Sequence, residues 1–286
     1  MNANEATLVW VDEFSRMAEA YDRNVVPRFE PIAREVLRLA APRANELVLD
    51  LGTGTGLLAC LVAPLVRPQG VVAIDLADGA IAVASYRAGN AGLRNIRFEM
   101  LDSRNIVYHG KLFDAAVSNL GIPNLGWDRV FQEVHRVLKP GGRFVFSEWP
   151  TDFPTSLAIP RELLAKYGTA TPSKELALVR EARRLARDDP ENAKLGNPAA
   201  VRKGLATAGF DRSDAATKSF PMRFRDPDEL LTFMTSFGWA ERELREMPDE
   251  HREGFRNEFA ARLEPLTAEG GIEDTWSLHF FSAFRE

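Results

Sequence analysis

The residues at 49–56 combine features that suit ligand binding. They read Leu-Asp-Leu-Gly-Thr-Gly-Thr-Gly and follow an apolar run. Because glycine lacks a Cβ atom, Gly52, Gly54 and Gly56 let a ligand approach the backbone closely. The free N–H groups of a helix that begins next would suit a carboxylate or a phosphate. The motif therefore predicts a ligand site where a strand turns into a helix.

Two classes of ligand compete for this loop. Dinucleotide-binding domains use G-x-G-x-x-G/A, and the last position of that pattern is the bulky Leu57 here. Asp50 stands two residues before Gly52, where an acid would face a pyrophosphate. An acid there suits a cationic ligand, and S-adenosylmethionine carries an ammonium and a sulfonium group. The loop therefore favours S-adenosylmethionine over NAD.

Two further acids end predicted strands. Asp75 ends the run at 71–75, and its carboxylate can accept hydrogen bonds from ribose hydroxyls. NAD domains place an acid in the same way, so Asp75 does not discriminate. Asp102, followed by Ser103, ends the next strand candidate and can accept a hydrogen bond from an adenine amino group. Acids at the ends of three successive strands are a more specific signal than any one of them.

Short apolar runs alternate with amphipathic segments from Glu46 to Trp149. One helix face is predicted from Trp127 to Leu138, and the residues at 139–142, Lys-Pro-Gly-Gly, are expected to end that helix. This alternation predicts a parallel sheet covered on both faces. The strand candidates in this region are 46–51, 71–75, 95–101, 113–118 and 143–147.

The rest of the chain is expected to add helices to a single domain of residues 1–286. Residues 180–189, rich in arginine, are interpreted as a solvated helix face. Residues 215–224 and 276–284 are further strand candidates. The predicted parts are a cofactor-binding core at about 44–150, an N-terminal helical cap at about 8–40, and a helical lid at about 151–200 and 226–265.

Taken together, these motifs resemble the class I S-adenosylmethionine-dependent methyltransferases. Within that class the sequence is similar to the small-molecule branch that includes the ubiquinone/menaquinone C-methyltransferases. The resemblance implies a Rossmann-like, doubly wound, mostly parallel sheet of seven strands whose final strand is antiparallel. The motifs that carry it are VLDLGTGTG at 48–56, AID at 73–75, LDS at 101–103, FDAAVSN at 113–119, EVHRVLKPGGRFVFSEW at 133–149 and HFFSAFR at 279–285.

The resemblance also implies roles for single residues. The methionine end of the cofactor would contact the glycine loop, the ribose Asp75, and the adenine Leu76, Asp102 and Ser103. Ala80 stands where relatives often place a bulky residue against adenine, which implies a looser pocket or one filled from elsewhere. The implied cofactor-binding residues are Asp50, Gly52, Thr53, Gly54, Gly56, Asp75, Leu76, Asp102, Ser103 and Asn119.

The cofactor motifs say little about the acceptor of the methyl group. Methyl transfer from a sulfonium needs a base only when the acceptor must lose a proton. No catalytic residue is assigned, and Tyr21 and Asn119 are the candidates. The lid candidates indicate an apolar or aromatic acceptor that is methylated on oxygen or carbon, and S-adenosylhomocysteine would be the second product. These candidates are Phe14, Tyr21, Phe153, Phe233, Phe237 and Trp239.

Composition narrows the remaining classes of function. The net charge of −5 disfavours nucleic acid as a partner. Neither a signal peptide nor an apolar run long enough to span a membrane is visible, and Cys60 is the single cysteine, which together predict a cytoplasmic protein. No metal is expected, because no histidine has a metal-ligand spacing. The aromatic residues at 233–239 suit either core packing or a homodimer contact.

Two other functions stay open at this point. One is a nucleotide-binding oxidoreductase of the NAD type, which Leu57 and Asp50 disfavour. The other is a non-catalytic protein that binds S-adenosylmethionine. Intact cofactor motifs argue against the second only mildly.

Overall fold

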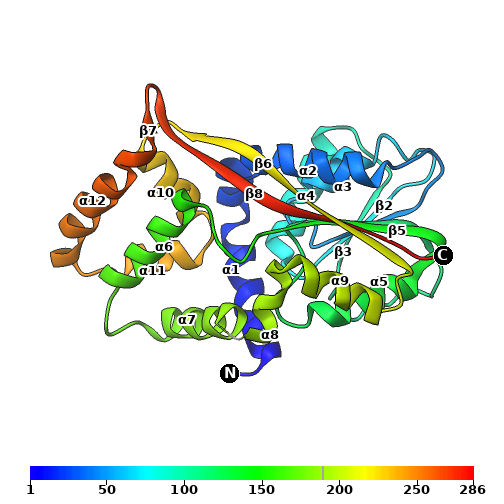
Figure 1. Cartoon of the computed structure of the whole chain (residues 1–286), viewed down its shortest axis with the longest axis horizontal. Helices are drawn as coiled ribbons and strands as arrows, with labels where there is room; N and C mark the ends of the chain where they lie inside the picture. Colours follow the sequence, from blue (N-terminus) through cyan, green and yellow to red (C-terminus); the bar gives the residue numbers. More distant parts are fainter. Residues whose placement is uncertain (189) are drawn as a thin grey trace.

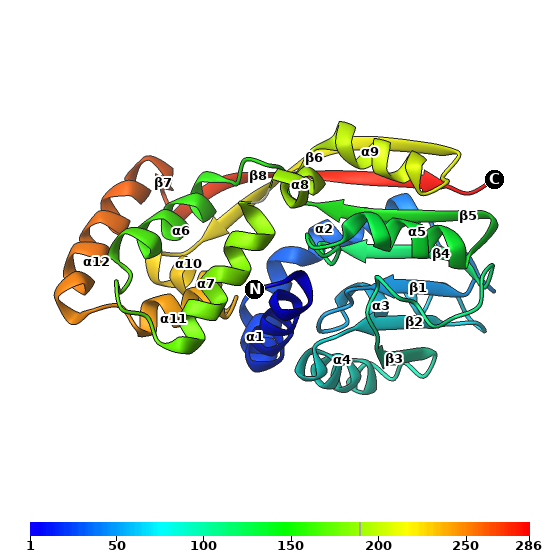
Figure 2. The same cartoon turned by 90° about the horizontal axis from the view of Figure 1, so that it is seen from below.

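Eight strands form one sheet in the computed structural model, which describes residues 1–188 and 190–286. Their order is β3-β2-β1-β4-β5-β8-β6, and the short β7 pairs with β8 (Figures 1 and 2). The strands are β1 (Val48–Leu51), β2 (Val71–Asp75), β3 (Ile96–Met100), β4 (Phe113–Asn119), β5 (Leu138–Glu148), β6 (Arg212–Phe224), β7 (Thr267–Ala268) and β8 (Gly271–Phe284).

The strands β1 to β5 are parallel, and each of the five predicted strand candidates is confirmed. Every residue of β1 is buried, as expected for a central strand with helices on both faces. The strand β1 pairs with β2 on one side and with β4 on the other, so the order of winding reverses there. In sheets of this kind, ligands bind at the carboxyl ends of the strands beside that reversal.

The start of β5 differs from its prediction. The helix that begins at Trp127 ends at Val137, and β5 already begins at Leu138, so Lys-Pro-Gly-Gly lies inside a strand. Phe113 pairs with Leu138, and the register then shifts before Ala115 pairs with Arg143. This irregularity accommodates the turn-forming residues without interrupting the strand.

The last strands run against the others. β8 pairs antiparallel with β5 and with β6, which confirms the predicted mostly parallel sheet with an antiparallel final strand. β6 and β8 stay paired from Arg212 opposite Phe284 to Phe224 opposite Ile272, and they extend beyond the other strands (Figure 1). The two-residue β7 was not predicted.

Helices cover both faces of the sheet. One core includes Ile32 and Val36 of α2, and the core on the other face includes Val130 and Val134 of α5. The helices are α1 (Ala3–Asn24), α2 (Val26–Ala40), α3 (Leu57–Val62), α4 (Asp78–Asn90), α5 (Trp127–Val137), α6 (Thr155–Tyr167), α7 (Lys174–Arg187), α8 (Pro190–Ala193), α9 (Pro198–Thr207), α10 (Pro227–Thr235), α11 (Trp239–Arg245) and α12 (Asp249–Leu263), with 3₁₀ turns η1 (Lys194–Gly196) and η2 (Glu264–Leu266).

A second group of helices stands at one end of the molecule. Figures 1 and 2 show α6, α10, α11 and α12 gathered around the extended ends of β6 and β8, with α1 between them and the parallel strands. The fully buried Trp276 of β8 anchors this group, and its indole N–H donates to Ser156 Oγ of α6 at 3.0 Å. Among the described residues, no helix is both long enough and apolar enough to cross a membrane.

Candidate functional site

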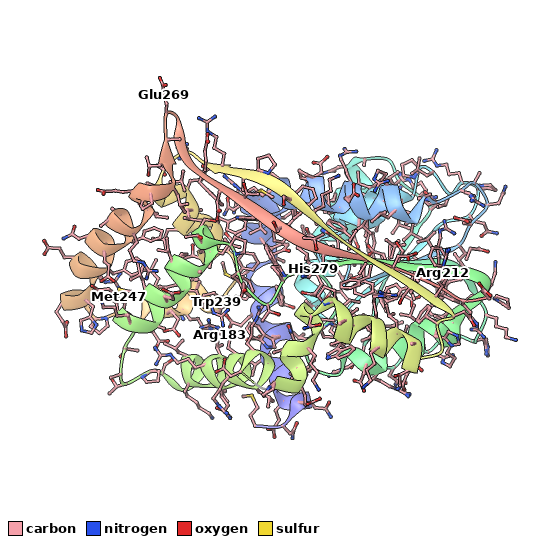
Figure 3. All side chains as sticks on the ribbon, in the orientation of Figure 1. Arg183, Arg212, Trp239, Met247, Glu269 and His279 are labelled. Carbon is pink, nitrogen blue, oxygen red and sulfur yellow. The ribbon has the colours of Figure 1, made fainter. Side chains whose placement is uncertain are left out.

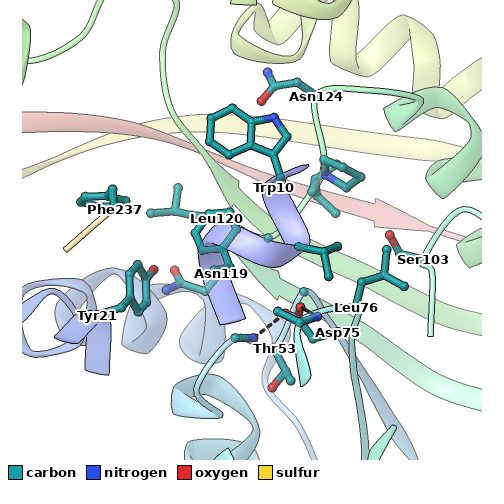
Figure 4. A pocket seen from close by; sticks show the side chains of 18 of the residues that line it. Trp10, Tyr21, Thr53, Asp75, Leu76, Ser103, Asn119, Leu120, Asn124 and Phe237 are labelled. Carbon is teal, nitrogen blue, oxygen red and sulfur yellow. Dashed lines mark hydrogen bonds between the residues drawn. The ribbon is translucent and has the colours of Figure 1, made fainter. Parts of the chain in front are cut away.

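A cavity of about 410 Å³ opens at the carboxyl ends of the parallel strands. Its walls come from the loops after β1 to β5 and from α1, α6, α7, α10 and α11. Figure 4 shows Thr53 and Asp75 on one side of it and Trp10, Tyr21 and Phe237 on the other. This volume lies in the range of small-molecule and cofactor sites. Of the predicted cofactor residues, all but Gly56 line the cavity, and so does Tyr21.

A side chain would meet different surroundings at each of the three glycines of the loop. All have positive φ, which favours glycine. A Cβ at Gly52 would lie 2.4 Å from the carbonyl oxygen of Gly121, so the loops after β1 and β4 need this close approach. Gly54 has open space where its Cβ would be, and it faces the cavity. Gly56 precedes α3 and packs against Ala84 instead.

Asp50 brings a buried carboxyl group to the cavity. Thr53 donates its hydroxyl to Asp50 Oδ2 at 2.7 Å, whereas Oδ1 is buried and has no hydrogen-bond partner within residues 1–188 and 190–286. Burial raises the pKa of Asp50 to about 7, although the hydrogen bond from Thr53 opposes that shift. An unpartnered buried oxygen is costly, and a cationic ligand group would satisfy it. The site therefore fits the predicted ammonium group.

The carboxylate of Asp75 is held in place by the backbone. The N–H of Gly54 donates to Oδ2 at 2.8 Å (Figure 4), and the N–H of Ala77 donates to Oδ1 at 3.0 Å. Burial raises the pKa of Asp75, and these hydrogen bonds oppose the shift. Each carboxylate oxygen has two lone pairs, so both oxygens can still accept from a ligand diol.

Asp102 has a partner that the sequence did not reveal. Arg104 forms a bidentate ion pair with it, with Nη2 2.7 Å from Oδ2 and Nε 3.0 Å from Oδ1. Burial favours a raised pKa for Asp102, but the hydrogen bonds from Arg104 outweigh it and lower the pKa. Arg104 also reaches Thr7 of α1 at 3.1 Å, so this end of the cavity is linked to the N-terminal helix.

The two catalytic candidates sit in different surroundings. Asn119 Oδ1 accepts a hydrogen bond from Ser147 Oγ at 2.9 Å, and Ser147 Oγ accepts from the N–H of Leu120 at 3.1 Å. Tyr21 packs edge to face with Phe237 at 5.6 Å between centroids. Burial and the charge of Asp75 raise the pKa of Tyr21, so its hydroxyl is suited to donate a hydrogen bond and is a poor base.

Aromatic rings line much of the cavity, as the acceptor prediction requires. The prediction is wrong for one ring. Phe233 is 1% exposed and belongs to the core, where it packs against Phe224 and Trp276. The aromatic residues at 233–239 therefore make contacts within the chain, and the homodimer stays a prediction. Three of the lining rings, Trp10, Phe29 and Trp149, were not among the lid candidates. The lining rings are Trp10, Phe14, Tyr21, Phe29, Trp149, Phe153, Phe237 and Trp239.

Helix α1 also fills the space beside α4. Ala80 does not line the cavity; it packs with Ala18 of α1 and with Ala77. A Cβ at Gly79 would lie 2.3 Å from the carbonyl oxygen of Ser15, so the two helices are in close contact. The small residue at position 80 is thus explained by helix packing.

The interpretation of residues 180–189 as a solvated face is wrong for two arginines. Arg183 and Arg187 line the cavity together with Arg161 of α6 and with Glu148, which follows Ser147 in β5. Burial raises the pKa of Glu148 to about 7. Sequence periodicity alone does not show which side of α7 meets the rest of the molecule.

Comparisons with known proteins find methyltransferases. Residues 48–142 match a family model described as a methyltransferase domain. The chain is 35% identical over 118 residues to a demethylmenaquinone methyltransferase of Thermus thermophilus, covering 41% of this chain and 53% of that protein. It is 27% identical over 238 residues to nocamycin O-methyltransferase of Saccharothrix syringae, covering 79% and 80%. The chain thus spans about half the length of several curated relatives that it matches.

A solved structure supports the fold. The YcgJ protein of Bacillus subtilis is 18% identical, with a TM-score of 0.56, covering 89% of this chain and 98% of that one. The family model and the curated relatives confirm the predicted class: residues 48–142 of the chain match a methyltransferase domain. The match to a methyltransferase domain agrees with the predicted cofactor, S-adenosylmethionine. Two structures of a phosphoethanolamine N-methyltransferase 2 of Haemonchus contortus, each 17% identical to this chain, share its fold and were solved with S-adenosylhomocysteine or S-adenosylmethionine. The alternative of an NAD-type oxidoreductase is not favoured.

Proposed function

We propose that this chain transfers the methyl group of S-adenosylmethionine to oxygen or carbon of a small acceptor with an apolar or aromatic body. One observation carries the proposal. Gly52 and Gly54 of the glycine loop and the three acids line the same cavity as eight aromatic side chains, so cofactor and acceptor would share one enclosed space.

Each end of the cavity has its own role in this proposal. Asp50 pairs with the ammonium group, Asp75 binds the ribose, and Leu76, Asp102 and Ser103 surround the adenine. The bound cofactor supplies an activated methyl group on a sulfonium. The chain contributes mainly alignment and exclusion of water, and alignment alone can be worth about 7–11 kcal/mol. Asn119 would lie near the reacting atoms.

The helices outside the sheet complete the proposal. Within a single domain of residues 1–286 and a core at about 44–150, the segments 8–40, 151–200 and 226–265 would act as cap and lid. Their rings reach the cavity from α1, from α11 and from the turn between α10 and α11, and the loop between β5 and α6 adds Phe153. A cytoplasmic location, a homodimer and the lack of a nucleic-acid partner remain predictions from the sequence.

Calorimetric titration with S-adenosylmethionine, S-adenosylhomocysteine and NADH tests the cofactor part of the proposal. We expect the first two to bind and NADH not to bind. Asp75→Ala should abolish or strongly weaken binding of the cofactor, because the carboxylate that accepts hydrogen bonds from the two ribose hydroxyls is lost. Asp214→Ala is the matched control, since Asp214 is exposed on β6 and does not line the cavity. Binding of NADH alone would overturn the proposal.

Turnover separates an enzyme from a protein that only binds the cofactor. Formation of S-adenosylhomocysteine should rise above the rate without acceptor when phenols, naphthols and 1,3-diketones with apolar bodies are screened. If the protein binds cofactor but methylates only small charged amines, the assigned acceptor class is wrong.

A further inference from the structure

Three arginines from two helices converge on the cavity. Arg161 comes from α6, and Arg183 and Arg187 come from α7. The guanidinium carbons of Arg187 and Arg161 lie 4.4 and 5.3 Å from the centroid of the same ring, Phe153. Arg183 stacks on Trp239 at 3.7 Å, and Figure 3 shows these two side chains beside each other.

These guanidinium groups are only partly exposed, yet few acids lie close to them. Within residues 1–188 and 190–286, no hydrogen bond or ion pair is made by the side chains of Arg161 and Arg187. The nearest acid to Arg183 is Glu243 at 4.0 Å, but Arg180 already binds both oxygens of that carboxylate, at 2.9 and 2.6 Å. Glu148 attracts Arg187 but forms no ion pair with it, so one acid at most offsets the charge of three arginines.

The surroundings of the cluster destabilise the charged form of two of its arginines. Burial, followed by the charge of Arg161, lowers the pKa of Arg183 and of Arg187 to about 10. Glu148 is the acid on the same cavity wall, and burial raises its pKa to about 7, so much of it is neutral near pH 7. A protein keeps unpaired buried charges at a cost, and an anion that binds among them would remove that cost.

The contact with an aromatic ring leaves the N–H groups of each guanidinium available to a ligand. An aromatic ring covers one face of the ion, while the N–H groups point outward in the plane, where they match two oxygens of a carboxylate or a phosphate. We propose that Arg161, Arg183 and Arg187 bind an anionic group, a carboxylate or a phosphate, on the methyl acceptor, whose apolar body packs against the aromatic wall. This inference rests on the proposed function, because it names the acceptor of that same site.

A pair of matched probes tests the inference. The protein saturated with S-adenosylhomocysteine is titrated calorimetrically with 6-hydroxy-2-naphthoate and with its neutral methyl ester, and 2-naphthyl phosphate forms a second arm. We expect at least one anion to bind about tenfold or more tightly than the ester, as charge-assisted hydrogen bonds imply. The anion that binds more tightly shows whether the arginines prefer a carboxylate or a phosphate group.

Two variants of one helix locate the effect. Arg187→Gln should weaken the preferred anion about tenfold or more and leave the ester unchanged, while Arg187→Lys should lie between. Arg184→Gln is the control, since Arg184 is 61% exposed and pairs with Glu181. Arg187 lies over Phe153 and is attracted by Glu148, so the melting temperature of each variant is measured as well. Unchanged affinity of Arg187→Gln for S-adenosylhomocysteine shows that the loss of anion binding is not caused by unfolding.

The outcomes separate this inference from the proposed function. Failure of S-adenosylhomocysteine to bind would count against the proposed function. In that case the anion and the ester are titrated into the protein without cofactor. Equal affinity for anion and ester, no binding of either anion, or an equal loss in Arg184→Gln would overturn the inference. So would weaker cofactor binding in Arg187→Gln, because the arginines would then serve the carboxylate of the cofactor.

Discussion

At the scale of single residues, the charge of one carboxyl group controls the cofactor end of the cavity. Asp50 is buried, one of its oxygens has no partner among the described residues, and its pKa is raised to about 7. A neutral Asp50 would attract an ammonium group only weakly, because it carries no negative charge. The cation instead stabilises the ionised form, so binding and loss of a proton are linked.

We therefore expect the affinity for S-adenosylmethionine to fall on acidification. Below pH 7, each pH unit should weaken binding by up to about tenfold, and binding should release close to one proton. Calorimetry in two buffers of different ionisation enthalpy measures both. Asp50→Asn should bind weakly with a flat pH profile; a wild-type profile that is flat between pH 5.5 and 8 would contradict the assignment.

At the scale of elements, a buried ion pair connects the N-terminal helix to the helices beyond the sheet. Glu13 of α1 is 3% exposed, and its Oε1 accepts from Arg242 Nε of α11 at 2.5 Å. Arg16 binds the other oxygen at 2.9 Å. Both α1 and α11 contribute rings to the cavity, so this pair fixes two of its walls relative to each other.

Breaking that pair should destabilise the fold. Arg242→Met leaves a buried carboxylate without its main partner, and we expect a loss of about 3–5 kcal/mol in the free energy of unfolding. Urea denaturation measures it. Adding Glu13→Gln to Arg242→Met should recover most of the loss. Arg245→Met on the same helix, where the arginine is 51% exposed, should change stability by less than about 1 kcal/mol.

At the scale of the whole molecule, the site makes stability depend on pH. Glu148 is buried, and its pKa rises from an ordinary 4.5 to about 7 on folding. The folded state therefore holds its proton more tightly than the unfolded state. That contribution to stability is fully present below pH 4.5 and is lost as pH rises through about 7.

Glu148→Gln should remove this penalty while keeping an oxygen to accept from the N–H of Trp149. Relative to the wild type, the variant should gain up to about 3 kcal/mol at pH 8 and nothing at pH 4.5, since one pKa unit corresponds to about 1.36 kcal/mol. Denaturation at the two pH values gives the difference. An identical gain at both would show that packing, and not charge, is responsible.

Local patterns in the sequence were sufficient for the sheet and for most of the candidate site. A glycine loop after a buried strand and acids at strand ends are positioned by their own elements, because the carboxyl ends of parallel strands share one edge. Asp50, Asp75 and Asp102 therefore meet as their positions at strand ends predict, and Asn119, which the family resemblance implied, lines the same cavity. Their roles toward the cofactor are proposals that binding measurements can test.

Only the tertiary structure decided what surrounds that edge. Arg161 and Arg187 are 26 residues apart on different helices, and nothing in either helix's periodicity shows that they lie over one ring. The same holds for Phe233 in the core and Phe237 at the cavity, and for Arg104, which binds Asp102 and Thr7 together. Sequence determines which side chains a local element presents; packing between distant elements determines which of them meet, and here that packing forms the acceptor side of the cavity.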